Sequence, residues 1–147
     1  MTMLKDILDT AAQRAAAKGL PYQGELTPQE AFAALQQGAA VLVDVRSRAE
    51  LELVGRVPHA NHVEWAFYPG MAANADFAAQ LQVQVDKNQA IVFMCRTGGR
   101  SHNAAVVACG LGYKAYNMLE GFEGDANAEK QRTLINGWRH AGLPWSN

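Results

Sequence analysis

Two short apolar segments constrain the fold of this 147-residue chain more than any other feature. Residues Ala40–Val45 and Ala90–Met94 are nearly uninterrupted apolar runs, and each has the length of a β-strand. Strands that are apolar on both faces are typical of parallel sheets with helices on either side. A chain of this length usually forms one core. We therefore expect a single α/β domain with a central, mostly parallel sheet flanked by helices on both sides.

Helix signals alternate with these strands. Thr27–Glu30 and Ser47–Glu50 each have the pattern of a capping box, which satisfies backbone N–H groups at a helix start. Together with apolar periodicity and glycine stops, they predict helices at about 28–37, 48–53, 74–85 and 101–111. Ser101 is expected to cap the last of these, a further strand is expected at Ala115–Leu119, and residues Ala126–Leu143 are expected to be largely helical.

The N-terminal segment has the pattern of an amphipathic helix that ends at Gly19. Its apolar residues recur at helical spacing (Leu4, Ile7, Leu8, Ala11, Ala12 and Ala15). We expect residues 1–23 to form a helical extension and residues 24–147 to form the domain proper. The helix either docks on its own domain or contacts a partner, such as a second copy of the chain. Asp6 and Asp9 interrupt any export signal, so a cytoplasmic location is expected.

Charge and composition exclude several function classes. The net charge is −1 and the pI is about 6.4, which argues against a broad nucleic-acid surface. The apolar runs are too short to cross a membrane, and two cysteines are too few for a secreted disulfide framework. Residues 87–119, however, contain four basic and no acidic side chains. This cationic stretch is suited to small anions, and it surrounds Cys95.

Cys95 is the strongest candidate for chemistry. It ends a predicted strand, where ligands bind in a parallel α/β sheet, and Gly98 and Gly99 allow the following loop to curl toward one point. A helix N-terminus and the charges of Arg96 and Arg100 favour the thiolate. We predict a nucleophilic thiol of lowered pKa, although a strand-end cysteine is also often a buried structural residue. Cys109 lies in an apolar helix and is expected to be structural rather than a resolving thiol.

Four motifs, in order along the chain, resemble the single-domain rhodanese family and together span roughly residues 25–145. They are Val43–Arg46, Gly55–Ala60, Cys95–Ser101 and Gly137–Pro144. The resemblance implies an α/β fold with a central parallel sheet. It also implies sulfur transfer, in which the loop cysteine takes a sulfane sulfur from a donor as a persulfide and passes it to a thiophilic acceptor.

The resemblance further implies a role for each site residue. Cys95 would be the catalytic nucleophile and persulfide carrier, and the backbone N–H groups of Thr97, Gly98, Gly99, Arg100 and Ser101 would cradle the outer sulfur. Arg96 and Arg100 would orient a small anionic donor such as thiosulfate, and Asp44 and Arg46 would be supporting residues. Cyanide or a thiol would be the acceptor. No metal and no organic cofactor is expected.

Two other functions remain open. Four residues separate Cys95 from Arg100, whereas the related loop of the dual-specificity cell-cycle phosphatases has five, and Met94 replaces the histidine that precedes their cysteine. A phosphatase or arsenate-handling enzyme is therefore the less favoured enzyme class. A sulfur-carrier or regulatory domain that acts with a protein partner is the other alternative. The insert at residues 123–136 departs from the family pattern, so the size of the substrate is left open.

Overall fold

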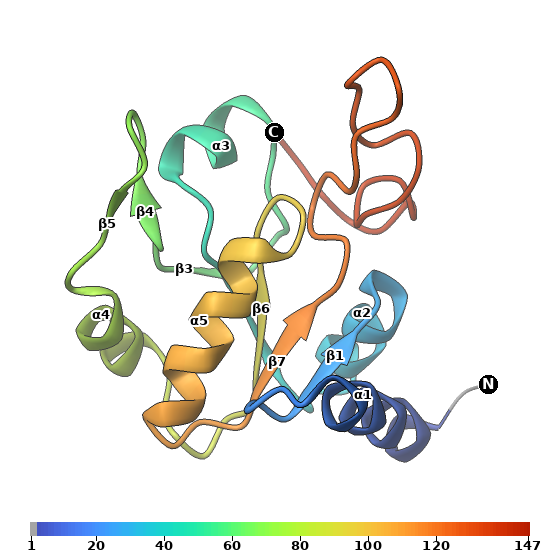
Figure 1. Ribbon diagram of the computed structural model, residues 1–147, viewed down its shortest axis with the longest axis vertical. Coiled ribbons are helices and arrows are strands. Elements are labelled where there is room, and N and C mark those ends of the chain that lie inside the picture. The colour runs from blue at the N-terminus through green and yellow to red at the C-terminus, as the bar shows by residue number, and fades with distance from the viewer. Residues whose placement is uncertain (1–2) are drawn as a thin grey trace.

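A five-stranded parallel sheet forms the centre of the protein (Figure 1). The computed structural model describes residues 3–147. Its strand order is β1-β7-β6-β2-β3, and every neighbouring pair is parallel. The strands are β1 (Gly24–Leu26), β2 (Val41–Asp44), β3 (Asn61–His62), β6 (Ile91–Met94) and β7 (Ala115–Met118). A separate antiparallel pair comprises β4 (Ala66–Phe67) and β5 (Ala72–Ala73). The expected α/β fold with a parallel sheet is confirmed.

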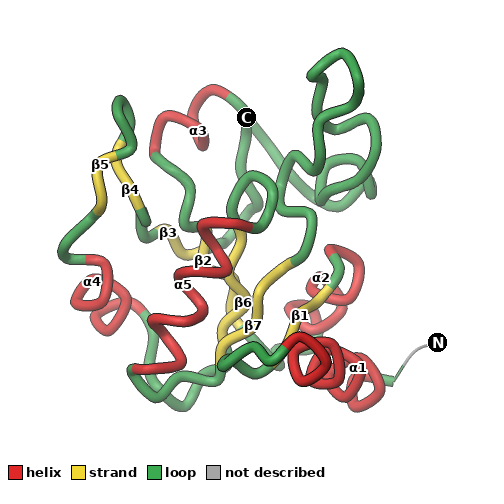
Figure 2. Tube along the Cα trace, viewed as in Figure 1, coloured by secondary structure: helices red, strands yellow, loops and turns green. Residues whose placement is uncertain are grey.

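Helices cover both faces of this sheet (Figure 2). They are α1 (Leu4–Lys18), α2 (Pro28–Gln36), α3 (Arg48–Leu53), α4 (Phe77–Gln84) and α5 (Gly99–Gly110). Side chains alternate along β6, so Ile91 and Phe93 pack with residues of α4 and α5, whereas Val92 and Met94 pack with residues of α1 and α2. All four are buried. The two apolar segments of the sequence are therefore β2 and β6, each buried on both faces.

The predicted helix starts are confirmed at both capping boxes. The Thr27 hydroxyl accepts a hydrogen bond from the Glu30 N–H, and the Glu30 carboxylate accepts one from the Thr27 N–H. Ser47 and Glu50 form the same reciprocal pair at the start of α3. These contacts satisfy N–H groups that would otherwise lack partners, so they fix where α2 and α3 begin.

The N-terminal helix packs on its own domain. It ends at Gly19 in the left-handed conformation, as predicted, and its residues Ile7, Ala11 and Ala15 are buried. A Cβ at Gly24 would overlap the backbone of Ala11, so α1 and β1 approach each other closely. Met1 and Thr2 lie outside the described residues, and the division into an extension and a domain proper stays a prediction.

The expected helix over residues 126–143 is wrong. No helix forms between residues 119 and 147, all of which the structure describes. Lys130 and Thr133 have positive φ angles of 64° and 75°, which a right-handed helix does not allow. The Asn127 side chain accepts hydrogen bonds from two nearby backbone N–H groups, an alternative that competes with helix formation. The segment instead folds back, and its Trp138 is buried against Phe32.

Among residues 3–147, no helix has both the length and the apolar character that a bilayer crossing requires.

Candidate active site

Cys95 lies directly after β6, the central strand of the sheet, at the carboxyl edge. In Figure 1 the loop from β6 to α5 stands at this edge, below α3. β6 is paired with β2 on one side and β7 on the other, so the backbone before Cys95 is held on both sides. Ligands of parallel α/β sheets bind at this end of the strands. The predicted position of the cysteine is confirmed.

The thiol of Cys95 is buried beneath its own loop. The residue is 1% exposed, and the Gly98 N–H donates to its Sγ at 3.1 Å. The Ser101 Oγ lies 3.4 Å from the same sulfur. Ser101 was expected to cap α5, but the helix begins two residues earlier, after Gly98 as N-cap. Only Arg96, Thr97 and Gly98 separate Cys95 from the helix, so Ser101 lies inside the first turn of α5. Its side chain is fully buried.

The two glycines of the loop differ in what they do. Gly98 has a φ angle of 117°, a conformation that side chains other than glycine rarely adopt, and this turn aims its N–H at the sulfur. Gly99 is the first residue of α5, its φ is not positive, and a Cβ there would meet no atom within 4 Å. Only Gly98 is required by the loop conformation.

The segment at residues 121–123 supports the loop through backbone hydrogen bonds. The backbone N–H of Phe122 donates to the Cys95 carbonyl at 2.8 Å, and that of Glu123 donates to the Arg96 carbonyl at 3.1 Å. A Cβ at Gly121 would overlap the Arg96 backbone, so only glycine permits this approach. The glycine-rich turn after β7 is therefore part of the scaffold of the site.

The two loop arginines are in different environments. Arg96 is exposed, and its guanidinium has no hydrogen bond to residues 3–147. Arg100 forms two hydrogen bonds to the Glu50 carboxylate, at 2.7 and 2.9 Å. Burial raises the pKa of Glu50, but its bonds to Arg100 and Ser47 outweigh this and hold the pKa at about 2. Donating to Glu50 likewise raises the pKa of Arg100, so both groups are charged at neutral pH. Arg100 is thus already paired, and Arg96 carries the unpaired charge of the loop.

Asp44 and Arg46 form a buried ion pair at the end of β2. The Arg46 Nη2 lies 2.7 Å from the Asp44 carboxylate, and the two side chains are 0% and 1% exposed. The Arg46 guanidinium also donates to the Gly55 carbonyl at 2.9 Å and lies 4.2 Å from the ring centroid of Phe122. Arg46 therefore joins three segments that surround the site, and the supporting role expected of Asp44 and Arg46 stays a prediction.

Two residues near the loop, Glu50 and Asn117, have contacts to it that no local sequence pattern indicates. Glu50 was identified only as a helix cap, although its carboxylate also binds Arg100. Asn117 in β7 is 4% exposed and contacts both Ser101 and Gly98. The available signal for Asn117 was one polar residue within a short, otherwise apolar strand.

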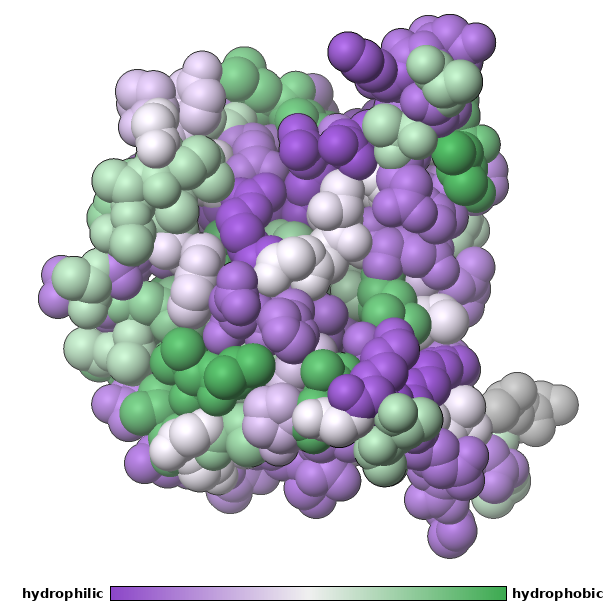
Figure 3. Space-filling model, viewed as in Figure 1, coloured by the Kyte–Doolittle hydropathy of each residue, from purple (hydrophilic) through white to green (hydrophobic). Residues whose placement is uncertain are grey.

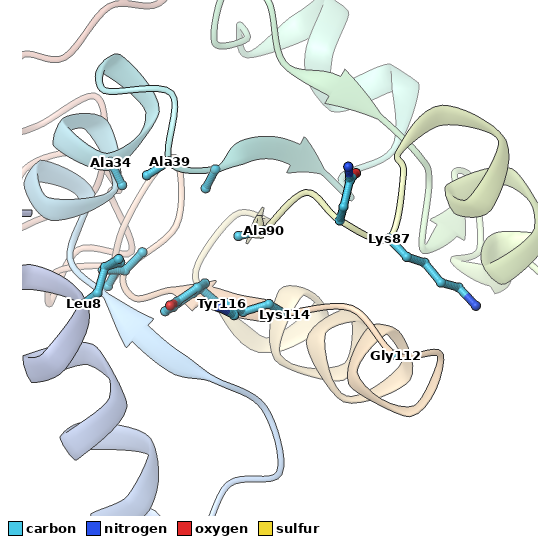
Figure 4. Close-up of a pocket in the computed structure, with 11 residues that line it drawn as sticks. Leu8, Ala34, Ala39, Lys87, Ala90, Gly112, Lys114 and Tyr116 are labelled. Carbon is cyan, nitrogen blue, oxygen red and sulfur yellow. The ribbon is translucent and has the colours of Figure 1, made fainter. Parts of the chain in front are cut away.

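Hydrophilic side chains gather at the loop, whereas a cavity and Cys109 lie away from the Cys95 thiol. On the face drawn in Figure 3, hydrophilic side chains gather over α3 and the β6–α5 loop. A cavity of about 360 Å³ lies at the opposite, amino ends of the strands, where Ala90 and Lys114 precede β6 and β7 (Figure 4). Cys109, half-buried on α5, donates from its Sγ to the Pro21 carbonyl at 3.0 Å. Within residues 3–147, no three His, Cys, Asp or Glu side chains are grouped to hold a metal ion.

Comparison with known proteins places the chain in a family. Residues 27–128 match the family described as Rhodanese-like domain. An uncharacterized protein of Rickettsia conorii is 40% identical over 109 residues, which cover 72% of this chain and 82% of that protein. A Haemophilus influenzae protein named thiosulfate sulfurtransferase GlpE is 32% identical over 111 residues, which cover 75% of this chain and 93% of that one. The crystal structure of Rv0390 from M. tuberculosis, 40% identical, has a TM-score of 0.78 and covers 85% of this chain and 98% of its own. The chain belongs to the rhodanese-like domain family.

Proposed function

We propose that this protein is a sulfurtransferase with Cys95 as its nucleophile and sulfur carrier. It would move a sulfane sulfur from an anionic donor such as thiosulfate to a thiophilic acceptor, either cyanide or a thiol. The observation that carries the proposal is the position of the Cys95 Sγ, 3.1 Å from the Gly98 N–H at the start of a 12-residue helix. A helix N-terminus combines unpaired N–H groups with a partial positive charge, so it favours a negatively charged sulfur.

The proposed reaction has two balanced steps. In the first, the Cys95 thiolate attacks the outer sulfur of thiosulfate, the S–S bond of thiosulfate breaks, and sulfite leaves with the bonding electron pair. In the second, the acceptor attacks the outer sulfur of the persulfide, which restores the thiolate and, with cyanide, yields thiocyanate. Both steps need a thiolate or persulfide anion, which the N–H groups of residues 97–101 would stabilise.

Charge on the loop supports an anionic donor. Arg100 is neutralised by Glu50, so the attraction for the donor would come from the exposed Arg96 and the N-terminus of α5. The four residues between Cys95 and Arg100 make a loop that resembles the sulfurtransferase type rather than the wider phosphatase type. We therefore expect turnover of thiosulfate and negligible turnover of an aryl phosphate.

Intact-mass spectrometry tests both steps in one experiment. The protein is incubated with thiosulfate and then with cyanide, and we expect the gain of one sulfur atom followed by its loss. Cys95→Ser should gain no sulfur. The matched control Cys109→Ser should behave as wild type, because Cys109 lies near the end of α5, away from the loop, and its thiol contacts the Pro21 carbonyl. A sulfur adduct that persists in Cys95→Ser would overturn the proposal. A persulfide on Cys95 that small acceptors do not remove would instead identify a carrier that needs a protein acceptor.

A further inference from the structure

A buried hydrogen-bond chain connects Cys95 to Asn117. The Ser101 Oγ lies 3.4 Å from the Cys95 Sγ and donates to the Asn117 Oδ1 at 2.6 Å. The Asn117 Nδ2 donates to the Gly98 carbonyl at 3.3 Å. Cys95, Ser101 and Asn117 are at most 4% exposed, so water does not substitute for these contacts. Asn117 therefore contacts the loop at Gly98 and the first turn of α5 at Ser101.

The direction of these bonds follows from the chemistry of their atoms. The Gly98 carbonyl can only accept, so the amide of Asn117 must turn its N–H₂ group toward it. The amide oxygen then faces Ser101, and it too can only accept. Ser101 has a single hydroxyl proton, which is consequently committed to Asn117.

This arrangement determines what Ser101 offers to the sulfur. With its proton on Asn117, the Ser101 oxygen presents only lone pairs to Cys95, so the S–H group is the donor across the 3.4 Å contact. A hydrogen bond donated by the thiol stabilises the neutral form. When Cys95 loses its proton to solvent, the Ser101 hydroxyl must rotate to donate to the sulfur, and its bond to Asn117 is then lost.

We propose that Asn117 is a positioning residue that directs the Ser101 proton away from Cys95 and thereby holds the resting cysteine as a thiol. The Gly98 N–H acts in the opposite sense, because a donor to the sulfur favours the thiolate. Asn117 would thus set the pH at which Cys95 becomes a nucleophile. The inference builds on the proposed function, since it concerns the same nucleophile.

Other charged and titratable groups lie around the site. They are Arg96 and Arg100 on the loop and α5, Glu50 on α3, Asp44 and Arg46 at the end of β2, and the hydrogen-bonded pair of Tyr22 and His102. Variants at Asn117 and Ser101 change none of these residues, and the contact between Asn117 and Tyr22 is removed equally with and without Ser101. A double-mutant cycle between the two positions therefore separates their coupling from the surrounding charges.

The experiment is a pH titration of the Cys95 thiolate by its ultraviolet absorbance and by the rate of alkylation with iodoacetamide. All proteins carry Cys109→Ser, which leaves Cys95 as the sole thiol. We expect Asn117→Ala to lower the midpoint by about half to one pH unit, the size of one neutral hydrogen bond. In the Ser101→Ala background the same substitution should cause no shift. Asn117→Asp keeps an acceptor for Ser101, so it should not lower the midpoint.

Three results would overturn the inference. They are an unchanged or raised midpoint in Asn117→Ala, an equal shift with and without Ser101, and a lowered midpoint in Asn117→Asp. Circular dichroism establishes that each variant is folded, and Asn117→Leu replaces Asn117→Ala if the smaller side chain prevents folding. The titration needs no sulfur donor, so it gives its answer even if Cys95 forms no persulfide and the proposed function fails.

Discussion

The ion pair between Glu50 and Arg100 joins helix α3 to the candidate active site, and its removal has a calculable effect. We consider Glu50→Gln, which removes the negative charge but keeps the length and shape of the side chain. Glutamine also serves at the third position of a capping box, so the start of α3 should persist. The substitution therefore tests the charge of Glu50 and leaves its capping contact with Ser47 in place.

The magnitude follows from the pKa of Glu50. Its value is held at about 2, against an ordinary value of 4.5, which corresponds to ~3 kcal/mol of folding free energy at neutral pH. The side chains of Arg100 and Glu50 are 21% and 19% exposed, so solvent screening reduces this to about 2 kcal/mol. Because the pKa is lower in the folded protein, the contribution is complete above pH 4.5. It should then disappear as the pH falls toward 2.

Urea unfolding of wild type and Glu50→Gln at several pH values measures this contribution. We expect a difference of about 2 kcal/mol at pH 7 that narrows steadily between pH 4.5 and the lowest pH at which both proteins fold. Glu52→Gln is the control on the same helix, since Glu52 pairs with Arg48 in an exposed contact and should lose less than about 0.5 kcal/mol. A difference that does not change between pH 7 and pH 3 would refute the reasoning, as would equal losses in the two variants.

Three further substitutions test other parts of the structure. Gly98→Ala should lower the free energy of unfolding by about 1–3 kcal/mol and slow alkylation of the buried thiol, because φ at Gly98 is 117°. Gly99→Ala, at an open helical position, should change neither quantity. Similar behaviour of the two variants would contradict the conclusion that only Gly98 is required by the loop. Asp44→Asn leaves the buried Arg46 charge without its partner and should lower the free energy of unfolding in urea by about 3–5 kcal/mol. A loss below about 1 kcal/mol, which is typical of exposed ion pairs, would argue against a buried pair. Thr27→Ala removes a cap and should cost about 1 kcal/mol, read from the same unfolding curves; no loss would mean that the capping box contributes nothing to α2.

Local signals explain why much of the fold was predictable. The capping boxes at Thr27 and Ser47 and the end of α1 at Gly19 depend on residues within a few positions of each other. The strands β2 and β6 are apolar on both faces because helices cover both sides. Because the apolar run of β6 ends at Met94, the sequence also places Cys95 at the carboxyl end of that strand.

Features that depend on distant residues were not predictable. Asn117 and Glu50 are 16 and 50 residues from their partners Ser101 and Arg100, and no local pattern indicates those pairings. The C-terminal segment has helix-forming residues, yet its backbone N–H groups bond to the turn at 121–123 instead. Tertiary hydrogen bonds therefore decided its conformation over local propensity.

The support of the loop by the turn at 121–123 has a consequence for synthesis of the chain. The carbonyl groups of Cys95 and Arg96 are bonded by N–H groups of Phe122 and Glu123, nearly thirty positions later. A ribosome-bound chain that ends before these residues contains the nucleophile but lacks the partners of its backbone. The site is therefore completed only when most of the polypeptide has been made, and a shorter nascent chain cannot hold the cysteine in its final geometry.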